Sequence, residues 1–135
     1  MTKWQDYIAA SRGLLMVATS FSDEPSLRMM GFAVDPEREN VWYLLTQPTA
    51  FKVKQLEQNS KVAIMTPLNE AGMRIESNQV TMVRSDKNWA EIEPLFAEHT
   101  AWHHGHPHPE TELIYELTFA SARLASWRET ENIHF

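Results

Sequence analysis

Runs of apolar residues separated by short polar turns follow one another through most of the chain. The first two runs, residues 14–21 and 26–34, flank a turn formed by Asp23, Glu24 and Pro25, so they predict a hairpin. Runs rich in aromatic and β-branched residues predict further strands at residues 41–46, 61–66, 73–83, 113–119 and 120–127. About six strands with short connections predict a mainly β fold, an antiparallel six-stranded barrel.

Three short stretches change from the strand period to the helical period. We expect one helix before Gly13, a second over residues 49–59 with Thr49 as its N-cap, and a third over residues 86–98. Pro94 is expected to shorten the third helix. These helices would decorate the barrel and contribute little to its core.

Composition and charge narrow the classes of function. The chain has 135 residues, of which 43% are hydrophobic and 22% charged, so we expect a single globular domain over residues 1–135. A net charge of −6 repels a phosphate backbone and argues against general nucleic-acid binding. No apolar run approaches the length of a membrane span, and the chain has no cysteine. We therefore expect a cytoplasmic protein without disulfides, thiolate chemistry or cysteine-bound metal.

Two cations and a glycine stand in unusual places. Lys52 falls in the first turn of the second helix, where the dipole favours a bound anion beside Thr46 and Thr49; the alternative is a lysine exposed to water. Arg28 falls in a strand with apolar residues on both faces, which predicts a central strand and a partner that is either a carboxylate or a ligand phosphate. Gly31 indicates either a bulge or a place where a flat ligand lies against the backbone.

Five of the six histidines fall within one run. Neutral imidazole binds metals, but no carboxylate stands at a recognisable ligand spacing, and a glycine and two prolines within and just after the run favour an irregular loop. We therefore predict no functional metal site there. A loop that lines a ligand, or that binds metal adventitiously, is the preferred interpretation of His99, His103, His104, His106 and His108.

Several large apolar residues admit a simple structural interpretation. Trp127, followed by Arg128, could stack over a ring, but core or subunit-interface packing is the simpler expectation. Core filling is likewise expected of Met16, Met29, Met30 and Met65. The chain has no nucleophile elbow, P-loop or dinucleotide fingerprint, so serine hydrolases, NTPases and Rossmann enzymes lack support.

The order of these segments resembles the flavin-binding split-barrel family related to pyridoxamine 5′-phosphate oxidase, in its small, general-stress-protein-like branch. The resemblance runs from Gly13 to about Asp86, with a weaker echo over residues 112–127. Its most specific part is Thr46 after an aromatic-rich strand, Lys52 six residues on, and then Gln55-Leu56 and residues 59–63.

The resemblance implies a cofactor, its ligands and a partner. In that family the residues matching Arg28 and Lys52 hold the phosphate of FMN, and the segments matching 29–31 and 45–46 touch the flavin ring. The resemblance also implies a homodimer with the cofactor between its subunits. Together with the helix-start threonine, this predicts the FMN-binding residues Arg28, Met29, Met30, Gly31, Leu45, Thr46, Thr49 and Lys52.

The implied activity is that of an FMN-dependent oxidoreductase, without an identified catalytic side chain. A true pyridoxamine phosphate oxidase is not expected, because Ala33 replaces the lysine that follows the family's arginine. Ala50 and Phe51 likewise replace a hydroxyl residue and an arginine that contact the phosphate. The alternatives are a non-catalytic flavin-binding stress protein, or a haem or deazaflavin binder in which the run at 99–108 supplies an axial ligand.

Overall fold

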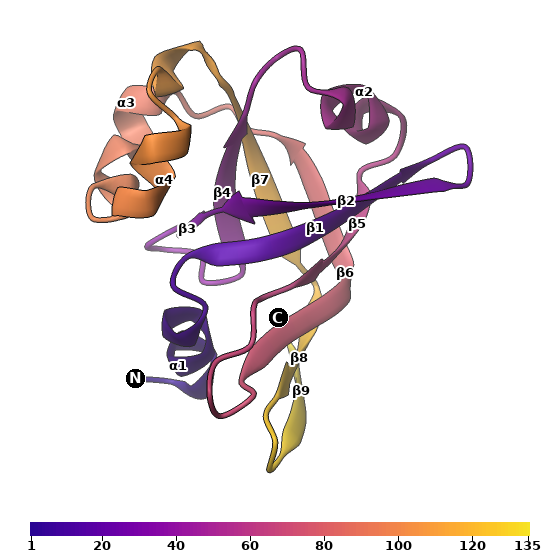
Figure 1. Ribbon diagram of the computed structural model, residues 1–135, viewed down its shortest axis with the longest axis vertical. Coiled ribbons are helices and arrows are strands. Elements are labelled where there is room, and N and C mark those ends of the chain that lie inside the picture. The colour runs from indigo at the N-terminus through magenta and orange to yellow at the C-terminus, as the bar shows by residue number, and fades with distance from the viewer.

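The computed structural model describes residues 1–135, and its strands form one curled antiparallel sheet, a split barrel (Figure 1). The strands are β1 (Leu14–Phe21), β2 (Glu24–Gly31), β3 (Ala33–Val34), β4 (Val41–Thr46), β5 (Lys61–Met65), β6 (Arg74–Arg84), β7 (Leu113–Phe119), β8 (Ser121–Ala125) and β9 (Thr130–His134). The helices are α1 (Lys3–Ala10), α2 (Phe51–Gln58), α3 (Trp89–Ile92) and α4 (Thr100–Gly105), with 3₁₀ turns at Glu93–Phe96 and Pro109–Thr111.

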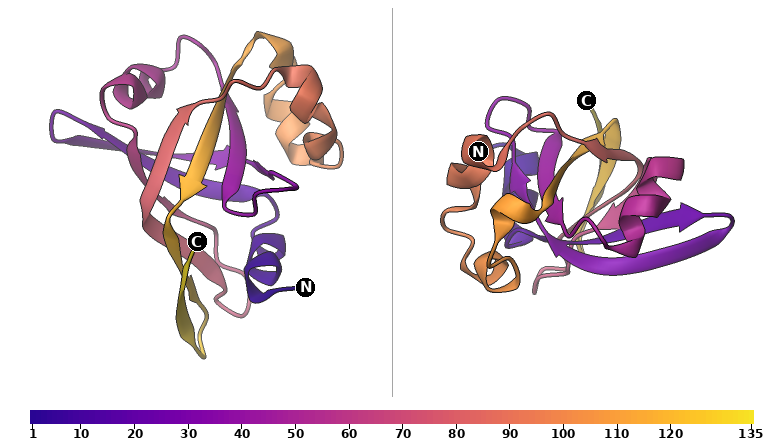
Figure 2. Two further views of the ribbon diagram at one scale, coloured as in Figure 1. Left: turned by 180° about the vertical axis from the view of Figure 1, so that it is seen from behind. Right: turned by 90° about the horizontal axis from the view of Figure 1, so that it is seen from above.

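The strand order is β2-β1-β5-β6-β7-β4-β3, and β6 is long enough to pair with β7 at one end and β8 at the other. The sheet therefore curls around a core while β8 and β9 extend away from it, as the left view in Figure 2 shows. The sheet has nine strands, more than the barrel of about six that was predicted and two more than the seven predicted runs. Phe32 separates β3 from β2, and β9 is polar and largely exposed, so no apolar alternation announces it.

The first hairpin differs from two expectations: the residues of its turn and the central place of the strand that carries Arg28. The turn is formed by Ser22 and Asp23, which both have positive φ, so Pro25 lies inside β2. A proline is tolerated there because β2 pairs only with β1 and is an edge strand, not a central one. Arg28 lies opposite Val17 on the face toward the barrel, while Leu27 lies on the outer face.

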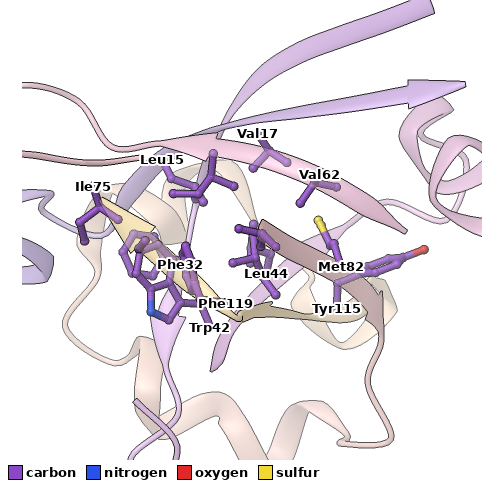
Figure 3. Packing of buried hydrophobic residues seen from close by; sticks show 14 of the residues in the cluster. Leu15, Val17, Phe32, Trp42, Leu44, Val62, Ile75, Met82, Tyr115 and Phe119 are labelled. Carbon is purple, nitrogen blue, oxygen red and sulfur yellow. The ribbon is translucent and has the colours of Figure 1, made fainter. Parts of the chain in front are cut away.

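The core fills the inside of the curled sheet (Figure 3). Phe32 and Trp42 stack with ring centroids 3.9 Å apart, and Trp4 from α1 packs against Trp42 at 5.7 Å. This aromatic stack closes the end of the barrel beside α1. The other labelled side chains come from β1, β4, β5, β6 and β7 and point into the same interior: Leu15, Val17, Leu44, Val62, Ile75, Met82, Tyr115 and Phe119.

The helix ends agree with the expectations in part. A capping box between Thr2 and Gln5 opens α1. The expected N-cap at Thr49 was wrong, because α2 begins one residue later with Ala50 at the cap and without a side-chain capping bond. Pro94 ends the third helix as expected: α3 stops at Ile92 and a 3₁₀ turn follows.

Residues 85–112 form an insertion between β6 and β7 that packs beside β4 (Figures 1 and 2). Phe96 and Trp102 from this insertion are buried against Tyr43 and Leu45 of β4. This packing also corrects the expectation of an irregular loop through the histidine run, because the buried Trp102 anchors α4 there.

Two methionines expected in the core lie at the surface, and Trp127, expected in the core or at a subunit interface, is outside the core of the single chain. Trp127 is 67% exposed and covers Gly72, whose missing Cβ leaves room for the indole. Met29 and Met65 are 54% and 36% exposed on the outer face of the sheet, because strand alternation turns them away from the core. No helix is both long and apolar enough to cross a membrane.

Candidate functional site

A cavity of about 340 Å³ opens between β2, the N-terminus of α2, the end of β4 and α4. This volume lies at the lower end of the range for small-molecule sites, roughly 300–1,000 Å³. Ala50, beside Thr49, lines the cavity, whereas Thr49 does not. Tertiary packing thus gathers seven of the eight predicted residues in one wall: Arg28, Met29, Met30, Gly31, Leu45, Thr46 and Lys52.

Arg28 reaches the cavity from the inner face of β2 without a carboxylate partner. Its Nη1 donates to Thr19 Oγ1 at 2.8 Å and to the Val17 carbonyl at 3.2 Å, and its Nη2 lies 3.4 Å from Gln55 Oε1. All these acceptors are neutral. Burial lowers the pKa of Arg28, so the site keeps an uncompensated positive charge at some cost.

Gln55 is a supporting residue that the sequence interpretation missed as part of the site. It is 1% exposed, its Oε1 accepts from Thr19 Oγ1 at 2.6 Å, and its Nε2 donates to Ser26 Oγ at 3.2 Å. These bonds tie α2 to β1 and β2 beneath the Arg28 guanidinium. Its signal in the sequence was the Gln55-Leu56 pair of the family resemblance, which assigned it no role.

Lys52 and the start of α2 supply the second positive element. Burial and the nearby Arg28 lower the pKa of Lys52, while Glu112 opposes this shift. The N-cap residue of α2 is Ala50, whose side chain cannot accept a hydrogen bond. The backbone N–H groups of the first turn therefore have no side-chain cap. Two cations and an uncapped helix N-terminus beside one cavity fit an anion.

Aromatic side chains of the insertion line the same cavity. The Trp102 Cδ1 atom lies 2.7 Å from the place where a Cβ at Gly31 would stand, and His99 Nε2 lies 3.3 Å from it. The flat group that lies against Gly31 is therefore an indole of the same chain. His99 also hydrogen-bonds the Gly13 carbonyl at 2.8 Å, which ties the insertion to the start of β1.

His106 and Glu112 complete the wall on the side of α4. His106 Nδ1 lies 2.6 Å from Glu112 Oε2, and the Glu112 side chain is only 2% exposed. The imidazole stacks on the Trp102 indole at 4.2 Å with 12° between the planes. The histidine run was visible in the sequence, but Glu112 carried no signal that could pair it with His106.

The two predicted residues of β4 lie at its end. Leu45 and Thr46 are 1% and 3% exposed, and both contribute to the cavity wall.

No group of three or more histidine, aspartate or glutamate side chains comes together to hold a metal ion. Chemically, the cavity offers positive charge, a hydroxyl, an aromatic wall and one imidazole–carboxylate pair, and it contains no activated nucleophile.

This curled antiparallel sheet with its decorating helices defines a protein of the split-barrel class. The sequence model of the pyridoxamine 5′-phosphate oxidase family matches residues 1–126, and the chain belongs to that family. No curated protein matches the chain in sequence.

Solved structures share the fold at low identity. A NimC/NimA family protein of Clostridium acetobutylicum superposes with a TM-score of 0.68 at 22% identity, over 97% of this chain and 89% of that one. A pyridoxamine 5′-phosphate oxidase-related, FMN-binding protein of Nostoc punctiforme gives 0.67 at 12% identity, over 100% and 97%. A heme binding protein of Mycobacterium smegmatis gives 0.73 at 15%, over 98% of this chain but 57% of its own length.

Proposed function

We propose that this protein binds FMN in the cavity between β2, α2 and α4 and acts as an FMN-dependent oxidoreductase. The observation that carries the proposal is the meeting of Arg28 and Lys52, two partly buried cations, beside the uncapped N-terminus of α2. A phosphate monoester would satisfy all three. The FMN-binding relative of Nostoc punctiforme supports the choice of this phosphate ligand.

The chain's own residues hold and orient the cofactor. Arg28, fixed by Thr19 and Gln55, presents its guanidinium to the phosphate, and Lys52 adds a second charge. Thr46 offers a hydroxyl in the same wall. Bound FMN would supply the hydride and electron transfer, and the insertion forms part of the wall around it.

We further propose that two copies of the chain form a homodimer that completes the site. The outer face of β2, β1 and β5 is apolar: Leu27 and Met29 are 69% and 54% exposed, and Met16 connects Met29 to Met65 across the strands. An apolar sheet face of this kind is typical of a subunit interface. It borders the cavity through Met29.

The first test is the visible absorption spectrum of the purified protein after FMN has been added and the excess removed. Retained flavin bands in stoichiometric amount, reduced by a nicotinamide donor and reoxidised by an acceptor, are the expected result. A retained flavin that no donor reduces would support a binding protein instead of an oxidoreductase. A colourless protein would reject FMN, and a Soret band in the protein as isolated would point to haem.

A matched pair of ligands tests where the phosphate binds. Arg28→Ala and Lys52→Ala should each weaken FMN by about 1.5–3 kcal/mol, the weight of a charged hydrogen bond, and leave riboflavin affinity unchanged. The measurement is the quenching of flavin fluorescence on titration with protein. Lys54→Ala, on the same helix but outside the cavity wall, is the control. Equal losses for FMN and riboflavin would remove these two residues from the phosphate site.

A further inference from the structure

The pair formed by His106 and Glu112 differs from the other histidine contacts of the insertion. His99 and His103 each use Nε2 on a backbone carbonyl, of Gly13 and Phe96 respectively, so they serve the packing of α4. His106 uses Nδ1, at 2.6 Å from Glu112 Oε2, and no protein group bonds its Nε2. Among the histidines, only His106 lines the cavity.

Two contacts fix the orientation of this imidazole. The Glu112 carboxylate holds its Nδ1 edge, and the Trp102 indole holds its face at 4.2 Å. In the neutral ring, Nδ1–H donates to Glu112 and Nε2 carries the lone pair; in the imidazolium, Nε2–H becomes a donor. A ring fixed at one edge and one face, with its second nitrogen free, is suited to gain and lose a proton at Nε2.

While His106 is neutral, the charged groups around it do not balance the two negative charges of a phosphate monoester dianion. Arg28 from β2 and Lys52 from α2 line the same cavity, and Glu112 lies before β7. With neutral His106 these groups carry one net positive charge, and with the imidazolium they carry two. Glu110, on the same segment, is exposed, and its Oε1 lies 3.7 Å from His108 Nδ1.

We propose that His106, held by Glu112, is a third cation of the cavity, and that binding of a phosphate monoester dianion draws one proton onto it. The proton comes from water, forms the Nε2–H bond, and returns to water when the anion leaves; no other bond changes. This inference rests on the proposed function, because FMN is the phosphate monoester assigned to the cavity. It predicts that the site selects a doubly charged phosphate at lower pH.

The experiment compares FMN affinity at pH 6.5 and pH 8.5, at constant ionic strength, by fluorescence quenching. We expect the wild-type chain to bind FMN about tenfold more tightly at the lower pH, the weight of one charge-assisted hydrogen bond at a partly solvated site. His106→Gln should bind with nearly the same affinity at both pH values, close to that of the wild type at pH 8.5. The FMN phosphate titrates equally in both proteins, so their difference belongs to His106.

Two further variants separate the charge of His106 from its packing. Glu112→Gln keeps the shape but removes the negative charge, so at pH 8.5 it should bind FMN as tightly as the wild type does at pH 6.5. His104→Gln, an exposed position on α4 two residues before His106, should keep the wild-type pH dependence. Riboflavin, which lacks the phosphate, should bind all variants without pH dependence.

The outcomes distinguish this inference from the proposed function. Any of three results would overturn the role of His106. The wild type could bind FMN equally at both pH values, or His106→Gln could keep the tenfold ratio. The third result is weaker FMN binding by Glu112→Gln. If the wild type binds no FMN at either pH, the proposed function fails. Sulfate then tests the role of His106, because the charge of sulfate is constant between pH 6.5 and pH 8.5. Sulfate should raise the Tm of the wild type alone more at pH 6.5 than at pH 8.5. Equal Tm shifts at the two pH values in the wild type would overturn the inference.

Discussion

Single residues in this protein matter most where polar groups are buried. Asp35 is 8% exposed, and its Oδ2 accepts from Tyr43 Oη at 2.6 Å and from the Arg38 guanidinium at 3.2 Å. Its Oδ1 accepts from the backbone N–H groups of Glu37 and Arg38 at 2.8 and 2.9 Å. Burial alone would raise the pKa of the Asp35 carboxyl, but these bonds lower it to about 2. Burial and the bond to Asp35 raise the pKa of Tyr43 to about 12.

The lowered pKa of Asp35 predicts part of the acid sensitivity of the fold. A carboxyl with a depressed pKa contributes stability above its unfolded value, near 3.8, that is lost as the pH falls toward 2. Between pH 4 and pH 2 the wild type should lose roughly 1–2 kcal/mol more unfolding free energy than Asp35→Asn. Urea unfolding across this range measures it, with exposed Asp23→Asn as control. Parallel curves for the wild type and Asp35→Asn would contradict the role of the network.

At the scale of elements, the placement of α4 depends on the missing side chain of Gly31. A methyl group there would stand 2.7 Å from Trp102 Cδ1, so β2 and α4 meet only because this position is glycine. The sequence admitted a bulge or a flat ligand at Gly31. A distant indole satisfies the same requirement, which a local pattern does not reveal.

Gly31→Ala should therefore destabilise the protein by about 1–3 kcal/mol through overpacking against α4. In the background of Trp102→Ala the same substitution should cost much less, because the clashing ring is gone. Chemical denaturation of the four proteins of this cycle measures the coupling. Gly105→Ala, where nothing lies within 4 Å, is the control and should change stability by less than about 1 kcal/mol. Additive costs for Gly31 and Trp102 would disprove the contact.

At the scale of the whole molecule, the apolar outer face of β2, β1 and β5 predicts self-association. Leu27→Glu places a charge at a position that is 69% exposed in the single chain and covered in the proposed homodimer. We expect the wild type to elute as a dimer of 15.6 kDa chains and the variant as a monomer, measured by light scattering after gel filtration. Val83→Glu, at an exposed apolar position on β6, should stay dimeric. A monomeric wild type would refute the proposed homodimer.

Local patterns were sufficient for most of the barrel. The strands around Val17, Leu44, Ile64 and Leu117 are rich in apolar, β-branched and aromatic side chains, and each lies where the sequence predicted a strand. The two cations were also visible, because an arginine in an apolar strand and a lysine at a helix start contradict their local surroundings. The sequence did not reveal the polar strand β9, because its side chains bury too little apolar surface to leave a hydrophobic pattern.

The sequence by itself thus determined the mainly β fold, because strand alternation acts over a few neighbouring residues. Its resemblance to the family, together with the unusual places of two cations, named seven of the residues that line the cavity. Only the tertiary structure decided which faces are buried. It made β2 an edge strand, turned Met29 outward, brought Gln55 beneath Arg28, and paired His106 with Glu112. These contacts join segments whose approach depends on packing across the whole sheet, and no local pattern encodes that approach.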